Sequence, residues 1–353
     1  MKKTLLAVAL MTGFAGVAQA ETSVTLYGLL DTAIGYERIK HDATGIAKKK
    51  TGLRDGTQSG NRWGLKGSED LGGGLRATFQ LESGFTLSDG EQGQSGRLFG
   101  RHATVGLAGD SWGQIDFGRQ TNIGSRFFVD VHGQGWGDTG SVNAFKGQDA
   151  YRMDNSVVYV SPNFSGFQFG AGYSFNVNGK QDFKVSGEKD TNQREFTTGL
   201  RYKSGPINVA LTYDQVRLQN VANANSYKNT KSWTLSGSYD FEVVAVSLAF
   251  GQDLDGDFAV DKQYKKNFDY NNYSVALAVP LGEGKLSGSY TMSEPRKEAK
   301  DIGQKKQHSY SLVYNYPLSK RTNMYVVGGY TDNYKHVNSD TRTLAAVGLR
   351  HRF

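Results

Sequence analysis

The chain has 353 residues, of which 45 are glycine, five are proline and none is cysteine, and its formal net charge is +7. The lack of cysteine excludes a disulfide framework and a thiolate metal site. Beyond residue 20, no apolar run approaches the ~20 residues that a membrane-spanning helix needs.

The first twenty residues have the features of a secretory signal peptide. Lys2 and Lys3 form a short positive head, residues 5–16 are mainly apolar, and Ala18-Gln19-Ala20 supplies the small residues of a cleavage site. We expect cleavage after Ala20, which removes two lysines and lowers the net charge to +5. Residues 21–353 show no internal boundary, so we expect them to form a single domain.

Alternation of apolar and polar residues, typical of a strand with two different faces, recurs through the rest of the chain. In Leu75–Glu82 the odd positions are apolar and the even positions polar or charged. Including this one, sixteen such segments occur, and the others are Val24–Tyr36, Asn61–Ser68, Arg101–Ala108, Gln114–Arg119, Ser156–Ser161, Phe167–Phe175, Glu195–Lys203, Ile207–Val216, Trp233–Tyr239, Ala245–Gln252, Tyr273–Val279, Lys285–Met292, Ser309–Tyr316, Asn323–Tyr330 and Leu344–Phe353. An even strand number is expected of a bacterial outer-membrane barrel, whose strands need only one apolar face. The low hydrophobic fraction of 37% agrees with this architecture.

The connectors fall into two alternating classes. Seven are short and rich in Gly, Pro, Asp and Asn: Asp70–Gly74, Gly109–Gly113, Pro162–Gly166, Ser204–Pro206, Asp240–Val243, Pro280–Gly284 and Pro317–Arg321. Eight are long and polar: Glu37–Gly60, Phe85–Gly100, Gln120–Asn155, Asn176–Arg194, Arg217–Lys231, Asp253–Asn272, Ser293–His308 and Asp332–Arg342. Short periplasmic turns and long outer loops are typical of outer-membrane barrels, which places both chain ends on the short-turn side.

The third long connector, Gln120–Asn155, is the longest of the eight, and long loops in compact folds are usually functional or disordered. It contains several large apolar residues, among them Phe127, Phe128, Trp136 and Phe145. Because these side chains need a surface to pack on, we expect this loop to fold against the inner barrel wall. A lid or a subunit contact is the alternative.

Several segments resemble the Gram-negative general porins, particularly the β-proteobacterial and neisserial branch. The matching residues are Val24–Gly28, Arg62–Gly74, Val105–Leu107, Phe117–Arg119 and Asn155–Tyr159 followed by Ser161-Pro162. The resemblance covers residues 21–353 in order and spacing. It implies an outer-membrane trimer of sixteen-stranded antiparallel barrels, each an all-β pore for small hydrophilic solutes whose third outer loop, here residues 120–155, narrows the channel.

A pore sorts solutes by its width and by the charges at its narrow point. Alternation places Arg62, Lys66 and Glu82 on the lumen side of their strands. Arg101 shares the parity of the lipid-facing Val105, so an inward Arg101 requires a bulge or a strand end.

The resemblance also implies residues for the constriction. In related anion-selective porins an arginine cluster matches Arg62, Arg101 and Arg152. Arg119 and Arg126 are further candidates. The opposing acidic wall would come from the inward loop: Asp130, Asp138, Asp149 and Asp154. Alternatively, these arginines bind loop carboxylates or lipopolysaccharide phosphates and do not meet solutes.

These observations predict a general-diffusion porin with a preference for anions. A substrate-specific channel for phosphate or organic acids is the alternative, and an adhesive or structural barrel is a third. No nucleophile or carboxylate pair accompanies His102, His132 or His308, so we expect neither an enzyme nor a cofactor. Asp253–Asp257 departs from calcium-loop spacing, so we expect no metal there.

The expected partners follow from compartment and family. We expect lipopolysaccharide and outer-membrane lipid around the barrel, with the lysines at 48–50 in the first outer loop, and no nucleic acid. The terminal Phe353 of an amphipathic strand is, by resemblance, what the barrel-assembly machinery reads.

Overall fold

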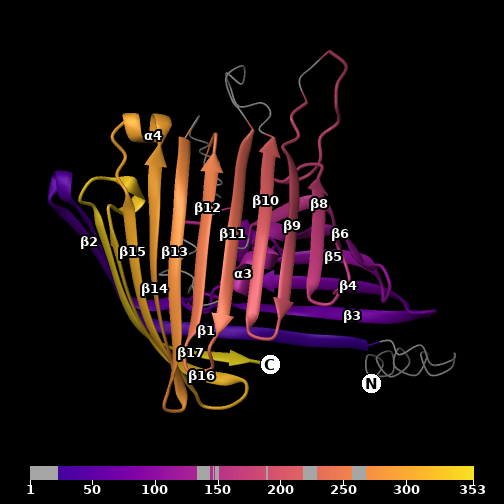
Figure 1. Cartoon of the computed structure of the whole chain (residues 1–353), viewed down its shortest axis with the longest axis horizontal. Helices are drawn as coiled ribbons and strands as arrows, with labels where there is room; N and C mark the ends of the chain where they lie inside the picture. Colours follow the sequence, from indigo (N-terminus) through magenta and orange to yellow (C-terminus); the bar gives the residue numbers. More distant parts are fainter. Residues whose placement is uncertain are drawn as a thin grey trace, which may run out of the picture.

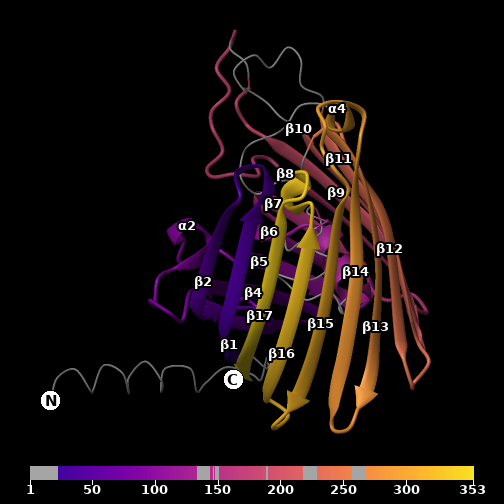
Figure 2. The ribbon, with the colours of Figure 1, turned by 90° about the vertical axis from the view of Figure 1, so that its left-hand side faces the viewer.

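The computed structural model describes residues 23–132, 144–145, 147, 151–187, 190–217, 229–256 and 268–353, so the predicted signal peptide lies outside the described residues. Within them, antiparallel strands form one sheet that closes into a barrel (Figures 1 and 2). The strands are β1 (Ser23–His41), β2 (Ile46–Asp55), β3 (Arg62–Gly72), β4 (Leu75–Gly84), β5 (His102–Gly109), β6 (Gly113–Thr121), β7 (Arg152–Val160), β8 (Phe167–Ser174), β9 (Arg194–Ser204), β10 (Ile207–Arg217), β11 (Thr230–Asp240), β12 (Ala245–Leu254), β13 (Phe268–Leu281), β14 (Gly284–Arg296), β15 (Gln307–Pro317), β16 (Thr322–Asp332) and β17 (Thr341–Arg352).

Strand β1 closes the barrel and pairs with three neighbours. On one edge it pairs with β17 along Leu29–Lys40. On the other edge, Ser23–Leu29 pairs with β3 and Thr32–His41 pairs with β2. Strands β2 and β3 therefore share one position in the wall, so the seventeen strands fill sixteen positions, as the alternation predicted.

The first long connector differs from the prediction. Glu37–Gly60 was expected to be a loop, but it contains the end of β1 and all of β2. The hairpin between them turns at Gly45, whose φ of 66° is one that L side chains rarely adopt. The lysines at 48–50 consequently lie in a strand, opposite residues 37–39 of β1, because main-chain pairing with β1 outweighs their weak strand preference.

The seven predicted short turns are confirmed, with two to six residues between paired strands. Both ends of the sheet lie on this side, because Ser23 pairs with Ser68 near one short turn and Thr322 pairs with His351 near another. Several strands extend further into the long connectors than predicted. In particular, β7 begins at Arg152, so residues 152–155 belong to the wall and not to the third long connector.

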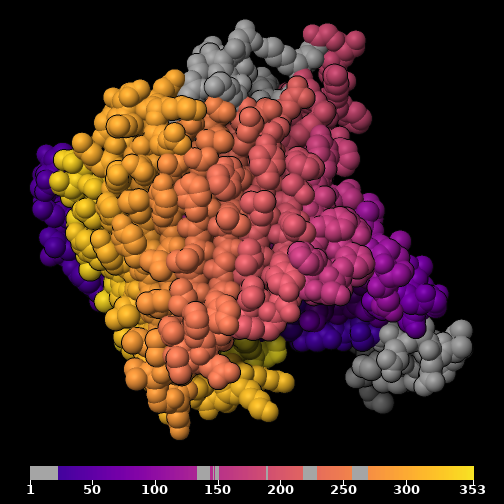
Figure 3. Space-filling view, in the orientation of Figure 1, coloured from indigo at the N-terminus to yellow at the C-terminus, as the bar shows by residue number. Residues whose placement is uncertain are grey.

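The two faces of the wall differ as the alternation predicts. In β10, Val209 and Leu211 are exposed on the outer face, whereas Ala210 and Thr212 are buried on the inner face. Aromatic rings also cross the outer face from β11 to β16 in successive contacts of 5.0–6.5 Å between ring centroids: Trp233 with Phe250, Phe250 with Tyr273, Tyr290 with Tyr310, and Tyr310 with Tyr330. Such aromatic girdles mark the border between lipid and water. The same strands form a continuous surface in the space-filling view (Figure 3).

The described helices are short: α2 (Gly93–Gly96), α3 (Ile123–Val131), α4 (Lys297–Asp301) and two 3-10 turns at Asp42–Thr44 and Tyr334–His336. None of the helices within the described ranges is long and apolar enough to cross a membrane. Only α3 is long enough to bury an apolar side, which packs with Met153 and Val158 of β7 and Ala210 of β10. In both ribbon views α3 lies behind the wall strands (Figures 1 and 2).

Helix α3 begins at a capped turn that is fixed to the wall. The Asn122 side chain accepts a hydrogen bond from the Ser125 amide, and the Ile123 amide donates to Thr197 Oγ1 of β9 at 2.9 Å. The Ile123 side chain lies against Gly170, where an added Cβ would be 2.5 Å from Ile123 Cδ1. Glycine at this position therefore allows the close approach of α3 to β8.

The buried carboxylate of Asp31 links the segment between β2 and β3 to β16, across the seam where β1 pairs with β17 and closes the barrel. Asp31 of β1 accepts hydrogen bonds from the Gln58 and Ser59 amides at 2.9 and 2.5 Å. The Tyr325 hydroxyl of β16 donates to the other carboxylate oxygen at 2.5 Å. Both Asp31 and Tyr325 are almost fully buried, so this network rigidifies the place where the wall closes.

We therefore expect Tyr325→Phe to destabilise the barrel. Removing the hydroxyl leaves a buried carboxylate one donor short, which should lower the free energy of unfolding by roughly 1–3 kcal/mol. Urea unfolding of the refolded protein in lipid vesicles measures this change. Tyr330→Phe is the matched control, because the Tyr330 ring is exposed on the outer face. Equal losses in the two variants would contradict the role of the Asp31 network.

Candidate functional site

Two arginines share one carboxylate on the inner face of the wall. Arg101 Nε donates to Glu82 Oε1 at 2.7 Å, and Arg62 Nε lies 3.8 Å from Glu82 Oε2. The Tyr27 hydroxyl donates to the same Oε2 at 2.9 Å. Glu82 is only 5% exposed, so one buried acid stands between two cations and the group keeps a net positive charge. We call Arg62 and Arg101, together with the Glu82 carboxylate between them, the arginine pair.

Arg101 reaches this group because it lies just before β5 begins. Its amide donates to the Glu82 carbonyl oxygen at 3.1 Å, which sets the first residue of the pairing. Val105 of the same strand is exposed on the outer face, as its parity predicts. The strand end, one of the two conditions anticipated for an inward Arg101, is therefore present. Gly84 leaves room for the side chain, since an added Cβ would lie 3.0 Å from Arg101 Cδ.

Arg152 and Arg119 hold the backbone beside Arg101. Arg152 Nε donates to the Arg101 carbonyl oxygen at 3.1 Å, and Arg119 Nε donates to the Gly100 carbonyl oxygen at 2.7 Å. Both guanidinium groups therefore fix the end of the second long connector. This contact links Arg152 to the arginine pair through main chain.

Asp154, expected on an opposing acidic wall, makes ion pairs with two arginines of its own. Arg119 Nη1 lies 2.6 Å from Asp154 Oδ1, and Arg97 Nη1 lies 2.8 Å from Oδ2. Among the described residues, Asp154 forms no ion pair with Arg62 or Arg101. Two local irregularities accompany this arrangement: the β6–β7 register shifts between Gly118 and Gln120, and residue 155 has a positive φ of 46°.

Asp130, on the last turn of α3, is paired with a residue that the sequence analysis did not single out. Arg201 of β9 forms an ion pair with Asp130, and Asn208 Nδ2 donates to the Asp130 carbonyl oxygen at 2.9 Å. The alternation of β9 contained the information needed, because Phe196 and Leu200 are exposed on the outer face and Arg201 has the opposite parity to both. Asp138 and Asp149, the other predicted acids, lie outside the described residues.

The end of α3 is also fixed to the wall through His132. Its Nε2 lies 2.9 Å from Ser274 Oγ of β13, and its ring packs on Phe128, with 5.4 Å between centroids. Burial lowers the pKa of His132 to about 4, so the imidazole is neutral at neutral pH. A neutral ring in this position adds no charge to the space beside α3.

Further cations follow the same side of the barrel as the arginine pair. Lys66, on the strand of Arg62, places its Nζ 5.4 Å from the centre of the Tyr27 ring. Arg350 of β17, also missed as a site residue, donates from Nε to Asn323 Oδ1 at 2.9 Å and from Nη1 to Ser59 Oγ at 3.3 Å. The parity of β17 could have identified Arg350, because Leu349 is exposed on the outer face. The wall of β1, β3, β5 and β17 is therefore rich in fixed positive charge.

Known proteins share both the sequence and this architecture. The family model described as Gram-negative porin matches residues 6–336. An outer membrane porin protein of Bordetella pertussis is 44% identical and covers the whole of both chains. Outer membrane porin protein 32 of Delftia acidovorans is 31% identical, over 99% of this chain and 94% of its own.

The solved structures agree with the sequence relatives. An anion-selective porin from Comamonas acidovorans superposes with a TM-score of 0.73 at 27% identity, covering 94% of this chain and all of that one. The closed sixteen-position barrel, the match over nearly the whole chain and the 44% identical relative lead to one conclusion. This chain belongs to the Gram-negative porin family.

Proposed function

We propose that the protein forms a water-filled pore in the outer membrane that admits small hydrophilic solutes and ions and prefers anions. The observation that carries the anion preference is the arginine pair, in which the single charge of Glu82 lies between the two positive charges of Arg62 and Arg101. A fixed positive group in a narrow channel with low-dielectric walls focuses the potential and enriches anions. The anion-selective porin among the structural neighbours supports the same preference.

We propose further that the connector expected at residues 120–155, whose two ends belong to β6 and β7, folds into the channel between those strands and forms the wall that faces the arginine pair. The contacts of α3 support this, since Ile123 and His132 at its two ends bind side chains of β9 and β13. Thr197 lies on the inner face of β9, because its neighbour Phe196 is exposed on the outer face. Asp138 and Asp149 remain predicted members of an acidic wall.

The pore would not prefer anions if acidic side chains on the loop balanced the positive charge of the wall that they face. Two of the described acids near α3 weaken this objection, because Asp130 is paired with Arg201 and Asp154 with Arg97 and Arg119. A carboxylate neutralised in this way contributes little to the potential along the channel. Glu195 and Asp214, at the start of α3, accept hydrogen bonds from the side-chain amide of Asn122. The alternative, a channel specific for phosphate or organic acids, would show a current that saturates with solute concentration.

We expect Arg62→Ala and Arg101→Ala each to shift the reversal potential toward that of a cation-preferring pore. Each substitution removes one of two cations beside Glu82 and should lower the chloride-to-potassium permeability ratio at least about twofold, since focused fields change local ion concentration by roughly 10- to 1,000-fold. The shift should be larger at 0.1 M salt, where the Debye length is ~10 Å, than at 1 M, where it is ~3 Å.

Planar-bilayer recording under a salt gradient measures these shifts. Arg76→Ala is the control, because Arg76 is exposed and paired with Asp110 beside a short turn. A wild-type pore that prefers cations in dilute salt would contradict the proposal, as would an unchanged reversal potential in both variants.

We also propose a homotrimer, with lipopolysaccharide and lipid around it. The outer face supports a subunit contact near β5, because Val105 is exposed there and the row of aromatic rings that marks lipid crosses β11–β16 on another side. Phe353, the proposed signal for the assembly machinery, is accessible, with 44% of its surface exposed.

We expect Val105→Trp to break the trimer into monomers, because a bulky ring would separate two flat apolar walls that are packed together. Leu248→Trp is the matched control, since Leu248 of β12 is equally apolar and similarly exposed but lies beside the aromatic row. Mass measurement in mild detergents distinguishes three protomers from one. Monomeric wild type across several such detergents would overturn the trimer.

A further inference from the structure

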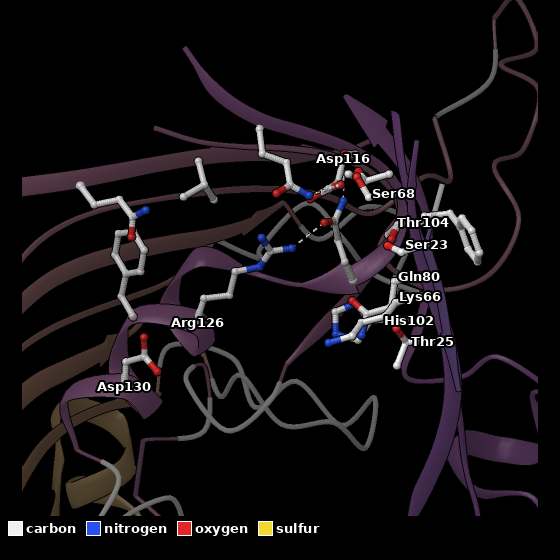
Figure 4. A pocket seen from close by; sticks show the side chains of 18 of the residues that line it. Ser23, Thr25, Lys66, Ser68, Gln80, His102, Thr104, Asp116, Arg126 and Asp130 are labelled. Atoms are coloured by element: carbon white, nitrogen blue, oxygen red, sulfur yellow. Dashed lines mark hydrogen bonds between the residues drawn. The ribbon is translucent and has the colours of Figure 1, made fainter. Parts of the chain in front are cut away.

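A cavity of about 530 Å³ lies beside α3 and toward the short turns from the arginine pair (Figure 4). Its floor is formed by the start of β1 and the end of β3, where Ser23 pairs with Ser68. Arg62, Glu82 and Arg101 do not line it. The cavity, which we call the lower chamber, is therefore a separate place along the same channel.

Two cations face the lower chamber from different elements, and neither forms an ion pair within the described part of the chain, although the charge of Asp116 acts on Arg126. Lys66 of β3 contacts only the face of the Tyr27 ring. Arg126 of α3 uses one of its five N–H donors, from Nη2 to Gln120 Oε1 at 2.5 Å. Figure 4 shows the Arg126 side chain extending from α3 toward the strands that carry Lys66 and His102.

The two carboxylates that line the chamber are already occupied. Asp116 accepts from Gln114 Nε2 at 2.9 and 3.0 Å through its two oxygens, and Asp130 is paired with Arg201. Since Arg201 offsets Asp130, the remaining fixed charges in the chamber are Lys66, Arg126 and Asp116. The chamber therefore keeps a net positive charge even with neutral His102.

Two polar groups without hydrogen-bond partners also line the lower chamber. The His102 ring lines the chamber and makes no hydrogen bond within the described part of the chain. Thr78 Oγ1, which also lines it, is buried and without a hydrogen-bond partner in the structure. Buried polar groups are normally hydrogen-bonded, and each exception calls for a partner such as a ligand or water.

We propose that the lower chamber binds small organic dianions, dicarboxylates above all. One carboxylate end is held by Arg126, whose planar guanidinium matches a carboxylate with two parallel hydrogen bonds. The other end is held by Lys66, and the His102 ring and the Thr78 hydroxyl, which line the same chamber, donate further hydrogen bonds to the carboxylate oxygens. Two cations that project into one chamber from separate elements favour a molecule with two charged ends over a single compact anion. The inference rests on the proposed pore, since the chamber is reached through its water.

Succinate is the probe, applied to the refolded full-length mature pore in a planar bilayer at constant ionic strength. We expect it to interrupt the current, and to reach the chamber faster from the short-turn side. Lys66→Gln and Arg126→Gln should each raise the half-blocking concentration by about tenfold or more, the effect of losing a hydrogen bond to a charged group. Butyrate, with one carboxylate on the same carbon chain, should block more weakly.

Three controls separate this binding from general effects of charge. Arg126→Lys should restore most of the block, which shows that α3 tolerates substitution at this position. Arg76→Gln should leave the block unchanged, because Arg76 lies outside the chamber. Arg62→Gln should shift the reversal potential and keep the block from the short-turn side.

The two proposals fail in different ways. Wild-type pores that conduct and prefer anions, but whose succinate block is unaffected by both Lys66→Gln and Arg126→Gln, would overturn the chamber alone. Equal blocking by butyrate and succinate would also overturn it, because one charged end would then suffice. Lack of anion preference in the wild type contradicts the arginine pair, whatever succinate does.

Discussion

Everything in this barrel depends on the closure of the sheet between its first and last strands. Gly28 and Phe353 exchange two main-chain hydrogen bonds of 3.0 and 3.1 Å. The Phe353 ring lies so close that a Cβ on Gly28 would be 2.2 Å from its Cζ. Closure removes the free edges that a sheet would otherwise expose, and backbone groups in lipid must be paired within the protein. The close pairing of Gly28 with Phe353 thus leaves no unpaired strand edge there, as a sheet that spans a membrane requires.

The same closure decides where charge can be held. Because β1 pairs with β2, β3 and β17, cations from several chain segments are brought to one side of the channel, and Arg350 arrives there from the opposite end of the sequence. The Asp31 carboxylate, which binds Tyr325 and the break between β2 and β3, keeps these strands in register. A basic wall assembled from distant segments therefore depends on the stability of the seam.

Much of this architecture could be predicted from alternation and connector length, because each strand must present one apolar face to lipid. The site was less accessible, for reasons that particular residues show. Arg101 faces inward only because β5 begins one residue later, and the surroundings of Asp154 depend on a register shift in β6. Such local irregularities cannot be recognised from the alternation of apolar and polar residues along a strand. The lysines at 48–50 were misplaced because pairing with β1, a tertiary effect, overrides local preference.

Helix α3 carries charges of both signs, and their partners give them different roles. Asp130 is paired with Arg201 and so binds the helix to β9, whereas Arg126 donates to the amide oxygen of Gln120 and forms no ion pair among the described residues. If the third long connector folds into the pore as proposed, it need not present an acidic surface along its whole length. An anion that passes the arginine pair would next meet Arg126 and Lys66, at a second positive place along its path. Two binding sites of moderate affinity in series let an ion enter and still leave, whereas a single site of high affinity would retain it.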